Sequence, residues 1–155
     1  MLTLYPNIMS FKHELEAKHH SLISNRDISR GSKVNHVTVG KLIKSDITLL
    51  YLSTFSKLIR YFEKQGATIE LGDFFCWKGE ELASNIGSLI ARLDPVPTEE
   101  EVAEKTGIPL LRMGNLVKGN VKRIYLKDLA ALLEFFRRRG VDIKIGNLLR
   151  EEELE

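Results

Sequence analysis

Hydrophobic positions in the second half of the chain recur at helical spacing and predict a series of helices. The first apolar face consists of Leu82, Ile86, Leu89, Ile90 and Leu93. The prolines of the run 94–97 end this helix. Thr98 stands three residues before Glu101, which is the spacing of a capping box, so the next helix is expected at 99–105.

Three further helices follow in the same half. A short one comes after Gly107 and Pro109, and a long one from Leu126 ends at Gly140, which suits a left-handed cap. A last short helix is expected at about 145–151. The pattern of the first half predicts helices at about 10–20, 25–30, 36–44, 51–65 and 71–77. We therefore expect an all-α fold with five helices per half and little or no sheet.

The two halves resemble each other without a gap when the sequence is shifted by 74 residues, so that 25–75 aligns with 99–149. The identical pairs are Gly40/Gly114, Leu42/Leu116, Lys44/Lys118, Tyr51/Tyr125, Leu52/Leu126, Leu58/Leu132, Phe62/Phe136, Gly66/Gly140, Ile69/Ile143 and Gly72/Gly146. Most other pairs keep their polarity. This period exceeds the roughly 20–50 residues of solenoid repeats, so we expect a duplicated small domain, at 1–78 and 79–155.

The segments EEEVAEKTGIPLLRMGNLVKG and NVKRIYLKDLAALLEFF carry the pattern of a helix-turn-helix. Ala103 allows two helices to cross closely, Gly107 makes the turn, and the buried side of the next helix consists of Ile108, Met113 and Leu116. This pattern resembles the lambda repressor-like (Cro/XRE-type) DNA-binding family. The resemblance implies two tandem five-helix modules. The first half departs from it, with Ser29 for the alanine and Lys33 for the glycine.

In such a family the second helix begins at a phosphate, and the third helix enters the major groove of double-stranded DNA. In the first half the second helix opens with Ser24, Asn25 and Arg26, which suit a phosphate. The third helix carries the polar residues Asn35, His36, Thr38, Lys41 and Lys44. Amide, amine and methyl groups of these types can read base edges. The alternative is that they form an ordinary solvated helix face.

The second half is less suited to reading bases. Three carboxylates at 99–101 stand where a phosphate would approach, and Leu110 and Leu111 stand where polar readers are expected. Its following loop is nevertheless basic, with Lys118, Asn120, Lys122 and Arg123. We therefore expect this half either to contact the DNA backbone through the loop or to mediate protein association, such as dimerisation, through Leu110 and Leu111.

The duplication also allows one chain to act as an intramolecular pseudo-dimer, with two helices about one DNA turn (~34 Å) apart. Apolar residues gather at the end of each half: Leu71, Phe74, Phe75 and Trp77 in the first, Ile145, Leu148 and Leu149 in the second. They can pack the two halves together or close the core of each half separately. The sequence leaves both possibilities open.

Composition places few further limits on function. Residues 1–78 hold 11 Lys and Arg against 7 Asp and Glu, or +4, and residues 79–155 hold 12 against 14, or −2. The single cysteine fits a reducing cytoplasm and excludes a disulfide framework. No apolar run is long enough to span a membrane, and no signal peptide is recognisable.

Enzymatic and metal sites are not expected. Gly40–Lys41 has the end of a phosphate loop without its first glycine or a preceding strand. His13, Glu16 and His20 share a helical face at metal-ligand spacing, but exposed side chains explain them better, so we expect no metal and no cofactor.

Together these features predict a non-catalytic, sequence-specific DNA-binding transcriptional regulator that reads the major groove with helix 35–44. The rival hypothesis is a protein-interaction module, antitoxin-like, anti-repressor or scaffold, that uses the same fold without DNA.

Overall fold

The computed structural model describes residues 2–153 and contains eight helices and six short strands in that range. The elements of the first half are β1 (Leu2–Pro6), α1 (Ile8–His19), α2 (Asn25–Ser32), α3 (His36–Ile43), β2 (Leu49–Tyr51), α4 (Leu52–Lys64) and β3 (Phe75–Lys78). Those of the second half are β4 (Glu81–Ser84), α5 (Ile86–Ala91), α6 (Glu99–Thr106), α7 (Leu110–Lys118), β5 (Arg123–Tyr125), α8 (Leu126–Arg138) and β6 (Leu149–Glu153). Both halves therefore follow the order βαααβαβ.

The expectation of an all-α fold is wrong. The strands form three antiparallel two-stranded ribbons, β1–β6, β2–β5 and β3–β4. The helices expected at 71–77 and 145–151 are absent from those ranges, which instead lead into β3 and β6, and residues 81–84 form β4 ahead of the shorter helix α5. Short apolar runs fit a helix and a buried strand equally well, and only the pairing partner decides between them.

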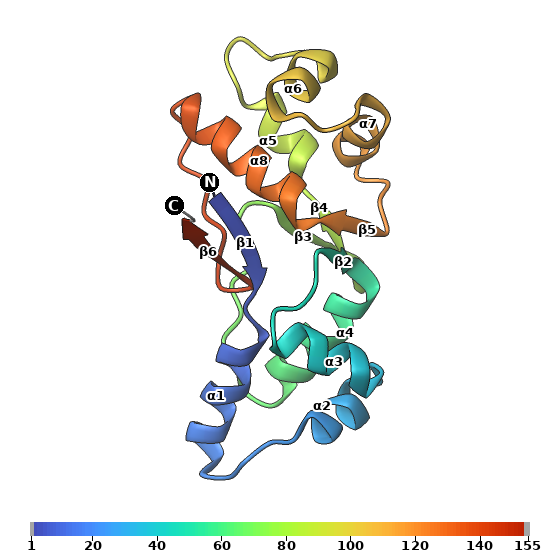
Figure 1. Cartoon of the computed structure of the whole chain (residues 1–155), viewed down its shortest axis with the longest axis vertical. Coiled ribbons are helices and arrows are strands. Elements are labelled where there is room, and N and C mark those ends of the chain that lie inside the picture. Colours follow the sequence, from blue (N-terminus) through green and yellow to red (C-terminus); the bar gives the residue numbers. More distant parts are fainter. Residues whose placement is uncertain (1, 154–155) are drawn as a thin grey trace.

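Each ribbon contains one strand from each half (Figure 1). In the β2–β5 ribbon, Leu50 pairs with Ile124, which is its equivalent 74 residues later. Likewise β3, at the end of the first half, pairs with β4, at the start of the second, and β6 pairs with β1. Such reciprocal contacts between equivalent surfaces are those of a twofold-symmetric dimer, here formed within one chain.

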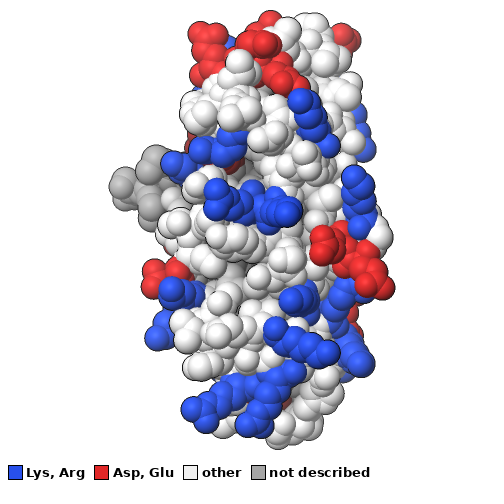
Figure 2. Space-filling view, turned by 90° about the vertical axis from the view of Figure 1, so that its right-hand side faces the viewer, with Lys and Arg blue, Asp and Glu red and all other residues white. Residues whose placement is uncertain are grey.

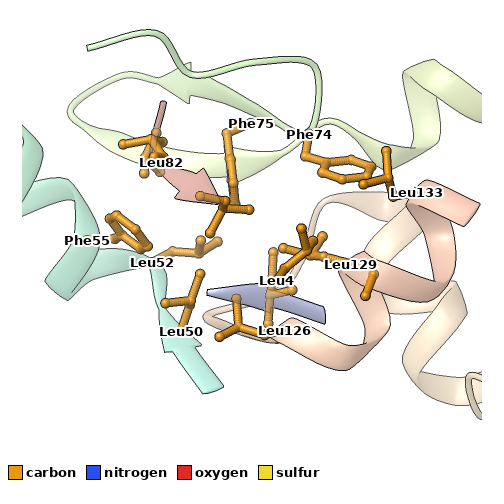
Figure 3. Packing of buried hydrophobic residues seen from close by; sticks show 14 of the residues in the cluster. Leu4, Leu50, Leu52, Phe55, Phe74, Phe75, Leu82, Leu126, Leu129 and Leu133 are labelled. Carbon is orange, nitrogen blue, oxygen red and sulfur yellow. The ribbon is translucent and has the colours of Figure 1, made fainter. Parts of the chain in front are cut away.

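A single hydrophobic core runs through both halves. At its centre, Leu50 and Leu52 of the first half lie near Leu126 of the second, with Leu4 of β1 beside them (Figure 3). Phe74 and Leu148, from the apolar ends of the two halves, are almost fully buried. The apolar ends thus join the halves to each other, although Trp77 is 37% exposed and lies outside the core.

Candidate nucleic-acid interface

The helix-turn-helix of the first half consists of α2 and α3, joined by a tight turn at Lys33. Lys33, which is the equivalent of Gly107, adopts the left-handed conformation, with φ of 63°. Gly107 itself has φ of 78° in the second half. The turn therefore keeps the same shape in both halves, although a lysine in this conformation costs about 1 kcal/mol relative to glycine.

The start of α2 is fixed by a reciprocal capping box. The Ser24 hydroxyl accepts the N–H of Asp27 at 3.1 Å, and the Asp27 carboxylate accepts the N–H of Ser24 at 3.0 Å. The backbone hydrogen bond from Ser24 is the main reason that the pKa of Asp27 is lowered. Sequence reasoning missed this carboxylate, whose capping-box spacing from Ser24 was the available signal. It places a negative charge beside the exposed Arg26.

Asn25 lies over α3 at the position of Gly40. A Cβ on Gly40 would be 3.7 Å from the Asn25 amide nitrogen, an ordinary van der Waals distance, so the Asn25 side chain lies next to α3 at this point. Asn25 is half-buried. The amide is therefore held at the junction of α2 and α3.

The residues expected to read bases are arranged along the outer side of α3. His36, Lys41 and Lys44 are exposed, and Thr38 is half-buried. Asn35 has a structural task, because its side-chain oxygen accepts the N–H of Val37 at 2.8 Å and caps the helix. Its amide nitrogen is not used in this cap.

Val37 is a surface residue that sequence reasoning did not single out. Its side chain lies in the first turn of α3 and is 54% exposed. An exposed aliphatic group in this turn can contact the methyl group of thymine. The sequence contained a signal for this exposure, since Val37 does not share the helical face of the buried Val39 and Leu42.

In the second half, a carboxylate takes the place of the Asn25 amide. Glu99, the equivalent of Asn25, reaches to within 3.3 Å of where a Cβ on Gly114 would lie. Thr98 caps the same helix by accepting the N–H of Glu101. The acidic start of α6 therefore lies directly against α7, the helix equivalent to α3.

Arg112 is tied to α8 rather than left free on the surface of α7. Its guanidinium donates two hydrogen bonds to Asp128, at 2.6 and 2.9 Å, and lies over the Tyr125 ring. The hydrogen bonds that Arg112 donates to Asp128 raise the pKa of Arg112. The buried carboxylate of Asp128 therefore holds Arg112 half-buried at the surface of α7.

Leu110 and Leu111 are the exposed apolar residues of α7, at 48% and 81%. These two residues begin the helix, so they occupy the positions that His36 and Val37 hold in α3. This half therefore presents an apolar first turn where the other presents a mixed one.

The loop after α7 is basic and leads into the central ribbon. Lys118, Asn120, Lys122 and Arg123 are all exposed. Arg123 opens β5 and pairs in register with the exposed Tyr51 of β2. These side chains thus continue from the end of α7 toward the ribbon.

The two helix-turn-helix units lie on one side of the molecule. In Figure 1, α3, α7 and the β2–β5 ribbon all lie on the right. Figure 2 faces this side and shows Lys and Arg spread over its lower and central parts, with Asp and Glu at its upper end, near α6, and in smaller groups at its edges. This face is therefore mainly basic in its lower and central parts and acidic at the end near α6.

Other candidate features do not join this face. Arg137, Arg138 and Arg139 bind Glu151, Glu134 and the carbonyl of Pro95 respectively. Within residues 2–153, no group of three His, Cys, Asp or Glu side chains could hold a metal ion. Glu16, which shares a helical face with His13 and His20, accepts the N–H of Ile23. No helix in the same range is long and apolar enough to cross a membrane.

Comparison of the chain with protein-family models, with curated proteins and with solved structures gives no match.

Proposed function

We propose that the chain is a sequence-specific, double-stranded DNA-binding transcriptional regulator of the lambda repressor-like (Cro/XRE-type) kind. The observation that carries this proposal is the placement of α3 and α7 on one face, at equivalent positions on either side of the β2–β5 ribbon. Two helices in this relation match the symmetry of successive major-groove segments on one side of a duplex.

In this proposal α3 is the helix that reads bases. His36 and Lys41 are exposed on it and offer donors to base edges, while Val37 offers apolar surface to thymine methyl groups. The start of α2 supports the docking, because Asn25 and Arg26 bring an amide and a positive charge to a helix N-terminus, where phosphates bind well.

In this proposal the second half mainly contacts the phosphate backbone of the DNA. Lys118, Lys122 and Arg123 are exposed cations close to one another in the chain, and phosphate contacts position a protein without reading sequence. Glu99 beside α7 opposes close approach of a phosphate at that helix. We therefore expect an asymmetric site, with one strongly read half and one weakly read half.

One chain supplies both helices, so the proposed binding unit is the intramolecular pseudo-dimer. It needs no cofactor, metal or catalytic group, and it would occupy a promoter-like site in the cytoplasm. Affinity would fall steeply with salt, because log K falls by about 0.9 for each phosphate neutralised per tenfold rise in salt.

Selection of bound duplexes from a random pool tests the proposal. Wild-type protein and the variant His36→Ala/Lys41→Ala are compared at moderate salt, with Lys64→Ala, at the far end of α4, as a matched control. We expect wild type and control to enrich the same motif and the double variant to lose it. Absence of any enriched motif with the folded wild-type protein would refute sequence-specific recognition.

A protein-interaction module is the second candidate, because Leu111 is 81% exposed next to the exposed Leu110. Adjacent exposed leucines more often mark a protein contact than a base reader. In this case Leu110→Ser/Leu111→Ser would abolish self-association or partner binding while leaving the chain folded. Sedimentation of wild type and variant in parallel distinguishes the two candidates.

A further inference from the structure

A hollow of about 710 Å³ lies between the two halves, away from the α3 and α7 surfaces. It is lined by strand β1, the loop 45–48, Tyr125 and the residues of α8 from Leu126 to Glu134 that face it. Most of its lining is apolar. Its volume falls within the roughly 300–1,000 Å³ typical of small-molecule sites.

Strand β1 turns an unpaired edge toward this hollow. Asn7 donates its N–H to Leu148 at 2.8 Å, and hydrogen-bonded pairs alternate along an antiparallel ribbon. Thr3 and Tyr5 therefore bond to β6, whereas the N–H and C=O of Leu4 point the other way. The neighbouring groups agree with this direction, since the Leu2 N–H reaches Glu134 and the Pro6 carbonyl accepts from Ser45.

The equivalent edge in the other half is satisfied by a serine. Asn7 and Asn85 donate matching backbone bonds, to Leu148 and Phe74, so Leu82 of β4, three residues before Asn85, occupies the position of Leu4. The Leu82 N–H donates to the Ser56 hydroxyl of α4 at 2.9 Å. The residue of α8 equivalent to Ser56 is Ala130, which lines the hollow and has no acceptor. Among residues 2–153, the Leu4 N–H has no hydrogen-bond partner, although Leu4 is only 2% exposed.

We infer that this hollow binds a small, neutral, largely apolar molecule whose carbonyl oxygen accepts the Leu4 N–H. Buried backbone donors are nearly always paired, so an unpaired donor beside an apolar hollow points to an acceptor supplied from outside the chain. The charged residues of the lining, Lys127, Asp46 and Glu134, sum to −1, so the hollow disfavours a carboxylate and the acceptor is a neutral carbonyl oxygen. The inference is independent of DNA binding, because none of the residues proposed to contact DNA lines the hollow.

Octanamide and octylammonium are suitable probes, because they share an alkyl chain while only the amide carries a carbonyl acceptor. Each is titrated into the ¹⁵N-labelled full-length chain, and the Leu4 amide resonance is followed by NMR. We expect octanamide to move the Leu4 proton downfield and to bind at least tenfold more tightly than octylammonium.

The variant Ala130→Ser provides the matched control, since it introduces the hydroxyl that Ser56 supplies in the other half. We expect it to fold, to move the Leu4 amide proton downfield without ligand, and to weaken octanamide binding at least tenfold. Octanamide that leaves Leu4 unmoved, or that binds wild type and Ala130→Ser equally, would overturn the inference. Equal binding of the two probes would overturn it as well.

Discussion

Asp73 and Asn147 stand 74 residues apart and make the same contact from opposite halves. The Asp73 N–H donates to the Lys144 carbonyl at 2.7 Å, and the Asn147 N–H donates to the Glu70 carbonyl at 3.0 Å. Their side chains repeat the exchange, accepting the N–H of Lys144 and of Glu70 at 2.8 Å each. These reciprocal bonds cross the junction between the halves and join them where Gly72 and Gly146 approach each other.

Gly146→Ala should destabilise the protein more than a change of backbone conformation alone explains. Gly146 has φ of 68°, and a Cβ there would collide with the Glu70 carbonyl oxygen across the junction. Gly140 is the matched control, because it has φ of 78° but open space around it. We expect a loss of about 2–4 kcal/mol in the free energy of unfolding for Gly146→Ala and about 1 kcal/mol for Gly140→Ala. Urea denaturation measures both, and equal losses would show that the junction is not closely packed.

Lys41→Ala should weaken specific DNA binding by about 1–3 kcal/mol, because a base-directed or phosphate-directed cation on α3 is lost. The control is Lys64→Ala, which removes an exposed cation at the end of α4. Fluorescence anisotropy with the selected duplex and with an unrelated duplex measures the effect. Unchanged affinity for the selected duplex would remove α3 from the interface.

Glu99→Gln should strengthen DNA binding if α7 lies near phosphate. The carboxylate rests against α7 at Gly114, so removing its charge relieves a repulsion of about 1 kcal/mol, or roughly fivefold in affinity, at low salt. Glu104→Gln is the control, since Glu104 is an exposed carboxylate later in the same helix. The gain should shrink as salt is raised. A gain for both variants would indicate a change in net charge rather than a local contact.

The Arg112–Asp128 pair can be tested against its counterpart in the first half, where Thr38 and Thr54 occupy the equivalent positions and line one small hollow. Asp128→Thr alone leaves the guanidinium without its partner and should cost about 1–2 kcal/mol of unfolding free energy, because Arg112 is partly exposed. The double variant Arg112→Thr/Asp128→Thr should recover about 1 kcal/mol relative to the sum of the single variants. A thermal or urea double-mutant cycle gives this coupling, and additive losses would show that the pair contributes no specific interaction.

Several local features were predictable because they depend on residues close together in the chain. The sequence predicted α2, α3, α6 and α7, since caps, turns and apolar periodicity over one or two helical turns set their ends. The positive φ of Lys33 followed from its alignment with Gly107. The exposure of His36 and Lys41 followed from the same helical periodicity, and that of the basic loop followed from its charged and polar residues.

The site differs from the sequence prediction where a side chain forms hydrogen bonds within the protein. Arg112 is held by Asp128, and Asn35 uses its oxygen to cap its own helix. The first of these needed knowledge of how α8 packs on α7, which the pattern of a single helix does not contain. Asn35 could have been recognised as a cap from its place just before α3.

The sequence by itself determined the duplicated order of elements, because its 74-residue period repeats glycines and apolar positions without a gap. Tertiary structure alone decided that the ends of the halves are strands and that every ribbon joins one half to the other. A strand gains its hydrogen bonds from a partner that can lie anywhere in the chain, as Tyr5 and Arg150 do across 145 positions. A helix finds its backbone partners four residues away, so local pattern specifies helices well and leaves strand pairing to the fold.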